Sequence, residues 1–145
     1  MTLAGYYGAG GAISRGEARR RAEEALGLVG LPVDETATTD GLGAAALKKL
    51  ELARALATKP TLLLADESLG GLDAAEMDRA ADMLLNIRSR MGITIIWVEH
   101  IMGVLMRVVD RVIVLDHGEK IFDGLPARAV QDARVTEVYL GKRRD

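Results

Sequence analysis

Cysteine is absent from this sequence of 145 residues. Its absence excludes a scaffold held together by disulfides and any metal site built on thiolates, and it fits a reducing compartment. A chain of this length corresponds to one domain and can bury a core without such cross-links. Because 49% of the residues are apolar and 28% are charged, the composition is that of a globular protein and not of a disordered one.

An excess of charge of one sign is also missing. The 19 basic and 21 acidic residues leave a formal net charge of -2, so the overall balance does not attract nucleic acid or acidic lipid. The apolar stretch 93–98 is far shorter than the ~20 residues that cross a bilayer. The Gly-rich start has no basic region before an apolar core. We therefore expect no nucleic-acid partner, no membrane span and no secretory signal.

The first part of the chain has the pattern of two helices. Ser14 and Glu17 have the spacing of a capping box, which predicts a helix over about 17–29. Gly30 can end this helix in the left-handed conformation. Apolar residues that recur at helical spacing predict a second helix over 42–57.

The second part alternates strands with helices. The apolar runs 61–65 and 93–98 predict strands, and the lack of alternation in the first favours a strand covered on both faces. Asp73 and Glu76 form another capping box, at the start of a long helix that stops at Gly92. Strands that alternate with helices predict a parallel sheet with right-handed crossovers.

The remaining pattern predicts a short helix and a hairpin. The helix covers about 101–109, and a strand over 112–115 returns over 120–122. Between the two strands, His117 precedes Gly118, and such a histidine is most simply an exposed turn residue.

Polar residues follow the two strands of the predicted parallel sheet. Asp66 and Glu67 end the first strand, and Glu99 and His100 end the second. Ligands of open α/β sheets bind outside these carboxyl ends. A carboxylate there can hold Mg²⁺ beside a phosphate, a second can orient or deprotonate a water, and a histidine can contact a phosphate oxygen. The alternative is that these residues are polar only because the chain leaves the core at each strand end.

Four segments resemble, in order and spacing, the second half of an ABC transporter ATP-binding subunit. They are LELARALA at 50–57, PTLLLADE at 60–67, GLD at 71–73 and VEH at 98–100. Within that family, four further segments look most like subunits of branched-chain amino-acid importers: GIT at 92–94, EHIM at 99–102, DRVIVLD at 110–116 and VYLG at 138–141. The resemblance covers about residues 12–141.

The resemblance implies a partial P-loop NTPase domain of the α/β class. Such a domain has a parallel sheet with flanking helices, here with a remnant helical subdomain and a carboxyl-terminal hairpin and helix. Residues 1–57 would form a loop and the helical subdomain. Residues 58–145 would form the α/β part with the two strands that carry the site.

The resemblance also implies roles for single residues. Asp66 would be the Walker B carboxylate that holds Mg²⁺, and Glu67 the general base that polarises the attacking water. His100 would be the switch histidine that senses the γ-phosphate. Asp73 would belong to the loop that contacts an opposite subunit, although a helix cap explains it equally well.

Two departures from the family pattern concern nucleotide binding. A P-loop needs G-x-x-x-x-G-K-[ST], but no lysine in this chain is followed by serine or threonine. The chain thus looks like the family with its amino-terminal portion removed. At the position of the family's signature motif, the nucleotide-contacting residues are replaced by Gly43, Ala44 and Ala45, so the serine hydroxyl and a glycine are lost.

The sequence therefore predicts part of the ATP-binding, ATP-hydrolysing subunit of an importer of amino acids, branched-chain ones in particular. ATP and Mg²⁺ are the implied ligands, although without a P-loop the chain is not expected to turn over alone. A second ATP-binding subunit and membrane permease subunits are the implied partners, at the cytoplasmic face of the cell membrane. One alternative is a non-catalytic module that pairs with a complete ATPase subunit or a permease. Another is a small metal-dependent phosphohydrolase that uses Asp66, Glu67, Glu99 and His100.

Overall fold

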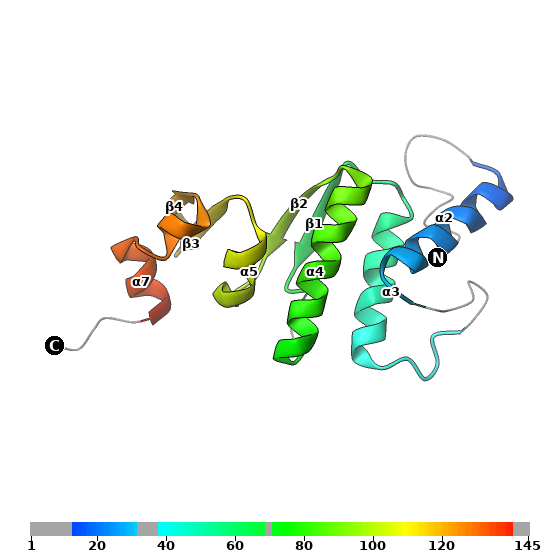
Figure 1. The fold of residues 1–145 in the computed structure, drawn as a ribbon, viewed down its shortest axis with the longest axis horizontal. Helices are drawn as coiled ribbons and strands as arrows, with labels where there is room; N and C mark the ends of the chain where they lie inside the picture. Colours follow the sequence, from blue (N-terminus) through cyan, green and yellow to red (C-terminus); the bar gives the residue numbers. More distant parts are fainter. Residues whose placement is uncertain (1–12, 32–37, 69–70, 141–145) are drawn as a thin grey trace. The chain divides into compact units, whose positions relative to one another are not determined.

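The structure, a computed structural model, describes residues 13–31, 38–68 and 71–140. Its internal contacts divide the chain into two compact units, 1–100 and 101–145 (Figure 1). No helix in the described ranges has the length and apolar character needed to span a membrane. The subdomain boundary expected at residues 57 and 58 stays a prediction.

The described residues of the first unit form three helices and a pair of parallel strands. Its elements are α2 (Arg15–Leu28), α3 (Ala44–Leu56), β1 (Leu62–Asp66), α4 (Ala74–Met91) and β2 (Thr94–Val98). The strands pair with Leu62 opposite Thr94 and Asp66 opposite Val98. Parallel neighbours need a crossover between them, and α4 supplies it. The predicted α/β class and the order of these elements are confirmed.

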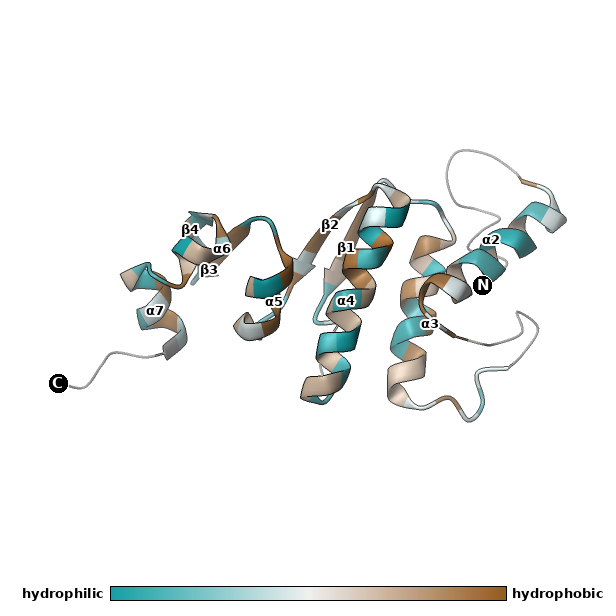
Figure 2. Cartoon of the chain, viewed as in Figure 1, coloured by the Kyte–Doolittle hydropathy of each residue, from teal (hydrophilic) through white to brown (hydrophobic). Residues whose placement is uncertain are grey.

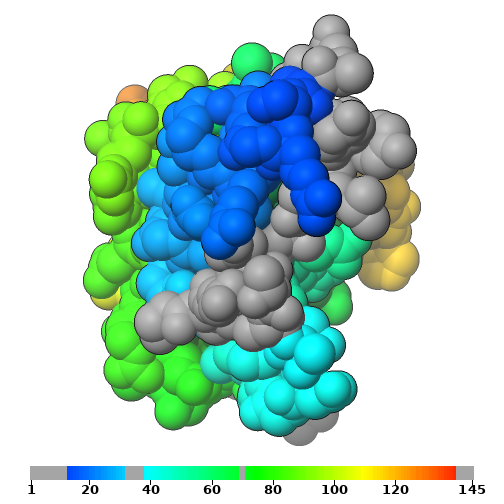
Figure 3. Space-filling view, turned by 90° about the vertical axis from the view of Figure 1, so that its right-hand side faces the viewer, coloured from blue at the N-terminus to red at the C-terminus, as the bar shows by residue number. Residues whose placement is uncertain are grey.

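The core of this unit lies between the three helices and one face of the strand pair. Ala53 of α3 and Ile87 of α4 are fully buried, and Leu63 of β1 is 5% exposed. Figure 2 shows brown apolar stripes on α3 and α4 and brown along both strands. Figure 3 looks at the unit from the side of α2, which packs on α3. The helices therefore hold the strand pair from one side.

Local signals in the sequence set the ends of the helices. The Asp73 carboxylate accepts the amide of Glu76 (2.7 Å), and the Glu76 carboxylate accepts the amide of Asp73 (3.0 Å). This reciprocal pair is the predicted capping box of α4. Gly92 ends α4 in the left-handed region at φ 64°, and Gly30 follows α2 at φ 63°. Both predicted stops are therefore confirmed. Glycine suits these positions because it adopts the left-handed conformation without a steric penalty.

The prediction that β1 is covered on both faces is wrong. Leu64 is 68% exposed, and Val98 of β2 is 56% exposed. The two strands expose a common surface, the bare face, which consists of Leu62, Leu64, Ile96 and Val98. Side chains alternate along a strand, and only the other set meets described helices. An apolar run alone does not show whether a second layer is present.

The second unit is built around an antiparallel hairpin. Its elements are α5 (Met102–Val108), β3 (Val112–Asp116), β4 (Glu119–Gly124), α6 (Pro126–Ala129) and α7 (Ala133–Leu140). His117 and Gly118 both have positive φ, 47° and 84°, as a type I′ hairpin turn requires. His117 is an exposed turn residue, as predicted. Among the described residues of this unit, the small core is lined by Val104, Val114, Ala129 and Val135.

Candidate functional site

Asp66 is the last residue of β1 and lies on the bare face. It follows Leu62 and Leu64 at intervals of two, so its side chain shares their side of the strand. It is exposed, and no described residue forms an ion pair or hydrogen bond with its carboxylate. A single free carboxylate of this kind suits Mg²⁺, which binds one or two protein carboxylates and keeps waters and substrate phosphates as its other ligands. The donor chemistry at Asp66 therefore fits the implied metal.

Glu67 lies immediately beyond the end of β1, in a backbone conformation that is rare for a residue with a side chain. Its φ is 45°, in the left-handed region. Its amide donates to the carbonyl of Val98 at 3.0 Å, which extends the ladder between the two strands by one bond. The side chain is exposed. Such strained positions persist only where surrounding contacts hold them, and they are frequent at functional sites.

The next residue, Ser68, has contacts that the sequence did not predict. Its carbonyl accepts a hydrogen bond from the ammonium group of Lys48 in α3, at 3.3 Å. Its own hydroxyl oxygen is buried and has no hydrogen-bond partner among the described residues. Lys48 thus joins the candidate site from a helix twenty residues earlier. No local pattern could have indicated this contact.

Glu99 and His100 follow β2, at the same end of the strand pair as Asp66 and Glu67. Glu99 is partly buried and accepts a hydrogen bond from the indole N–H of Trp97 at 3.3 Å. Trp97 packs against the core, so Glu99 continues the packed side of the strand. His100 is exposed.

The predicted convergence of these three acids and the imidazole does not amount to a metal site. Within the described ranges, no group of three His, Asp or Glu side chains is arranged to hold a metal ion. Alternation along the strands explains this result, since Asp66 continues the bare side and Glu99 the packed side. The hypothesis of a self-contained metal-dependent phosphohydrolase loses its geometric basis.

The remaining predicted site residues lie at the starts of two helices. Asp73 caps α4 through the bonds described above, so its carboxylate has a structural role whatever else it contacts. Gly43 is the N-cap of α3, with no side-chain hydrogen bond, and Ala44 and Ala45 form its first turn. A serine in place of Gly43 would accept one of the free amides of that turn.

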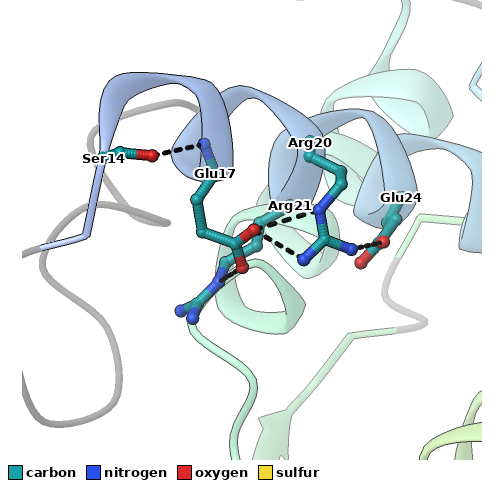
Figure 4. A network of polar contacts seen from close by, with 5 residues as sticks. All are labelled: Ser14, Glu17, Arg20, Arg21 and Glu24. Atoms are coloured by element: carbon teal, nitrogen blue, oxygen red, sulfur yellow. Dashed lines mark hydrogen bonds and ion pairs between the residues drawn. The ribbon is translucent and has the colours of Figure 1, made fainter.

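A network of charged side chains lies on α2, and of its contacts the sequence predicted only those between Ser14 and Glu17 (Figure 4). The Ser14 hydroxyl accepts the amide of Glu17 at 3.1 Å, which is half of the predicted capping box. The Glu17 carboxylate binds Arg21 at 2.8 Å and Arg20 at 3.0 Å. The hydrogen bond from Arg21, followed by that from Arg20, lowers the pKa of Glu17 to about 2. This network fixes the surface of α2 and contributes no group to the candidate site.

The comparisons with known proteins agree on one family. No protein-family model matches the chain. The sequence is 34% identical over 139 residues to the methionine import ATP-binding protein MetN of Staphylococcus haemolyticus, covering 96% of this chain and 36% of that protein. It is 39% identical over 121 residues to the MetN protein of Rhodospirillum rubrum, covering 83% of this chain and 32% of that protein. The chain thus spans about a third of these relatives.

Solved structures give the same result for the fold. CbiO1 of Clostridium perfringens, part of the ABC transporter complex cbiONQ, matches with a TM-score of 0.77 and 26% identity, over 88% of this chain and 52% of that one. The ADP conformation of MJ1267, an ATP-binding cassette of an ABC transporter, matches with a TM-score of 0.73 and 25% identity, over 85% and 50%. The chain has a partial ABC ATPase fold and corresponds to part of an ABC transporter ATP-binding subunit.

Proposed function

We propose that this chain supplies the hydrolytic residues of the ATP-binding subunit of an amino-acid importer. The observation that carries the proposal is the end of β1, where Asp66 is exposed and Glu67 is held in a left-handed conformation beside β2. The similarity to import ATP-binding proteins over nearly the whole chain supports the same assignment.

Each residue has a separate task in the proposed reaction. Asp66 would hold Mg²⁺, which, when bound, neutralises charge on the phosphate oxygens. Glu67 would orient and polarise the water that attacks the γ-phosphate, because its exposed carboxylate can accept a proton from water. His100 would contact the γ-phosphate from the end of β2, and Asp73 would reach an opposite subunit from the start of α4.

The phosphate-binding loop must come from residues that this sequence does not contain. The 145 residues hold no G-x-x-x-x-G-K-[ST] motif, and Gly43, Ala44 and Ala45 offer only the amides of a helix start to a nucleotide. A complete ATP site therefore requires a second polypeptide segment with a P-loop. A second ATP-binding subunit and permease subunits complete the proposed assembly, at the cytoplasmic face of the membrane.

The transported substrate is proposed at two levels. Import of an amino acid is supported by every named sequence relative above. The names of these relatives favour methionine, whereas the segments at 99–102 and 110–116 resemble importers of branched-chain amino acids. Uptake assays with each permease type, energised by the completed subunit, distinguish methionine from leucine or isoleucine.

The proposal is tested by adding a separately expressed P-loop segment of a related subunit to the chain. ATP hydrolysis should appear and should be lost in Glu67→Gln, which keeps the shape of the side chain and removes the base. Glu119→Gln, an exposed glutamate on the hairpin, is the matched control and should keep full activity. Activity that persists in Glu67→Gln would remove Glu67 from the reaction.

A non-catalytic role is the second candidate, and the bare face favours it. Exposed apolar side chains on paired strands suit a protein partner, and they do not require hydrolysis. This alternative predicts binding to a complete ATP-binding subunit or a permease, with no ATPase activity in the test above.

A further inference from the structure

We propose that Lys48 is a positioning residue for Glu67, an inference that rests on the proposed role of Glu67 as the base. The ammonium group of Lys48 donates a hydrogen bond to the carbonyl of Ser68, and thereby restrains the backbone immediately after Glu67. Lys48 does not touch the reacting atoms in this proposal. It acts by holding the backbone next to Glu67, whose carboxylate contacts the reacting water.

The first part of the argument is that Glu67 lies between two anchors. On its amino-terminal side, its own amide is bonded to the carbonyl of Val98 at 3.0 Å. On its carboxyl-terminal side, the carbonyl of Ser68 is bonded to Lys48 at 3.3 Å. The two anchors come from β2 and from α3, which are separate elements of the same unit. Between them the backbone turns sharply away from the strand direction.

The second part is that the conformation of Glu67 needs such support. A non-glycine residue in the left-handed region is disfavoured by roughly 1 kcal/mol or more, and it relaxes unless its surroundings hold it. Relaxation to a negative φ would aim the Glu67 side chain in another direction. A base must lie within hydrogen-bond reach of the water that it polarises, so its direction affects the rate of the chemical step.

The third part is that α3 is a firm base for the lysine. Ala53 and Leu56 of this helix are buried in the core of the unit, and Leu50 packs against that core. Lys48 therefore extends from an element whose position is fixed. The ammonium group donates a charge-assisted hydrogen bond, which is stronger than a bond between neutral groups.

The neighbouring residue provides the matched comparison. Lys49 carries the same charge as Lys48, lies in the same helix and is also partly buried. Successive residues of a helix point about 100° apart, so only one of the two can reach a given carbonyl. In the structure it is Lys48 that donates the hydrogen bond to the Ser68 carbonyl.

The test uses the 145-residue chain with Lys48→Met, Lys48→Arg and Lys49→Met. The backbone conformation of Glu67 is followed by its three-bond HN–Hα coupling and its Cα and Cβ chemical shifts. We expect the positive φ to be lost in Lys48→Met and kept in Lys48→Arg and Lys49→Met. Lys48→Gln, which removes the charge and shortens the reach, should match Lys48→Met and replaces it if that variant does not fold.

The second readout is hydrolysis by the chain completed with a P-loop segment. Lys48→Met should lower kcat about tenfold, because the base is misdirected, and should leave KM for ATP within about twofold. Lys48→Arg should restore kcat, and Lys49→Met should not change it. If the completed chain has no activity at all, the proposed function fails while the spectra still decide the role of Lys48. Unchanged Glu67 spectra in both Lys48→Met and Lys48→Gln would overturn the inference.

Discussion

Both faces of the β1–β2 pair carry large apolar side chains, but the two faces differ in exposure. On the packed face, Leu63 is 5% exposed and lies against helices, whereas Leu64, the next residue, is 68% exposed. Both outer edges of the pair also lack a strand neighbour among the described residues. Parallel strands are ordinarily covered on both faces. The difference teaches that the sequence is suited to two covering layers, of which the described residues provide one.

The largest expected effect is on the packed face. Ile87→Ala removes a side chain that is 0% exposed in the core between the helices and the strands. It should lower the free energy of unfolding by about 2 to 5 kcal/mol, through lost burial and the cavity that remains. Chemical denaturation followed by circular dichroism measures this loss. A loss of unfolding free energy well below 1 kcal/mol would show that Ile87 is not tightly packed between the helices and the strands.

Substitutions on the bare face should change self-association and leave the free energy of unfolding almost unaltered. Leu64→Thr together with Ile96→Thr should leave stability within roughly 1 kcal/mol, because both side chains are already exposed. The native chain should elute as an oligomer or bind a hydrophobic dye strongly, and the double variant should reduce both. Amide exchange over 61–66 should be fast in each case. A monomeric native chain with protected amides and little dye binding would show that the bare face is covered in solution.

Features that depend on neighbouring residues could be predicted from the sequence. The Asp73 and Glu76 box, the stop at Gly92 and the turn at His117 are set within a few positions, and the structure confirms them. Of the capping box predicted at Ser14, the structure has the hydrogen bond from the Glu17 amide to the Ser14 hydroxyl. The Glu17 carboxylate binds Arg20 and Arg21 instead of closing the box.

Features that depend on distant residues could not be predicted. The contact between Lys48 and Ser68 joins positions twenty residues apart. Which strand faces are covered depends on the placement of whole helices, so the exposure of Leu64 was missed. For the same reason the sequence alone does not show that Asp66 is exposed while Glu99 lies partly buried on the other side of the strand pair.

A smaller effect on stability is expected at the start of α4, the helix whose buried residues pack against the strand pair. Asp73→Ala removes the cap of α4 and should cost about 1 kcal/mol of stability. Asp82→Ala, an exposed residue in the same helix, is the control and should change stability by less than about 0.5 kcal/mol. Equal effects of the two changes in thermal unfolding would contradict a capping role for Asp73.

The smallest effect concerns the surface of α2. The pKa of Glu17 is lowered from 4.5 to about 2 by its bonds to Arg21 and Arg20. The stabilisation from the charged carboxylate is present above the unfolded pKa and is lost as the pH falls from about 4.5 towards 2. Glu17→Gln should flatten stability against pH in this window. An unchanged pH profile would show that the ion pairs are not maintained in solution.

The central proposal is that Asp66 and Glu67 serve an ATP site whose phosphate-binding loop is absent from these 145 residues. Calorimetric titration of the 145-residue chain with ATP in the presence of Mg²⁺ tests this claim most directly. The account predicts no saturable binding from micromolar to low millimolar nucleotide, because no backbone loop or lysine of the P-loop type is present. A clear micromolar isotherm that disappears in Asp66→Asn would contradict it, since the chain would then hold a complete nucleotide site of its own.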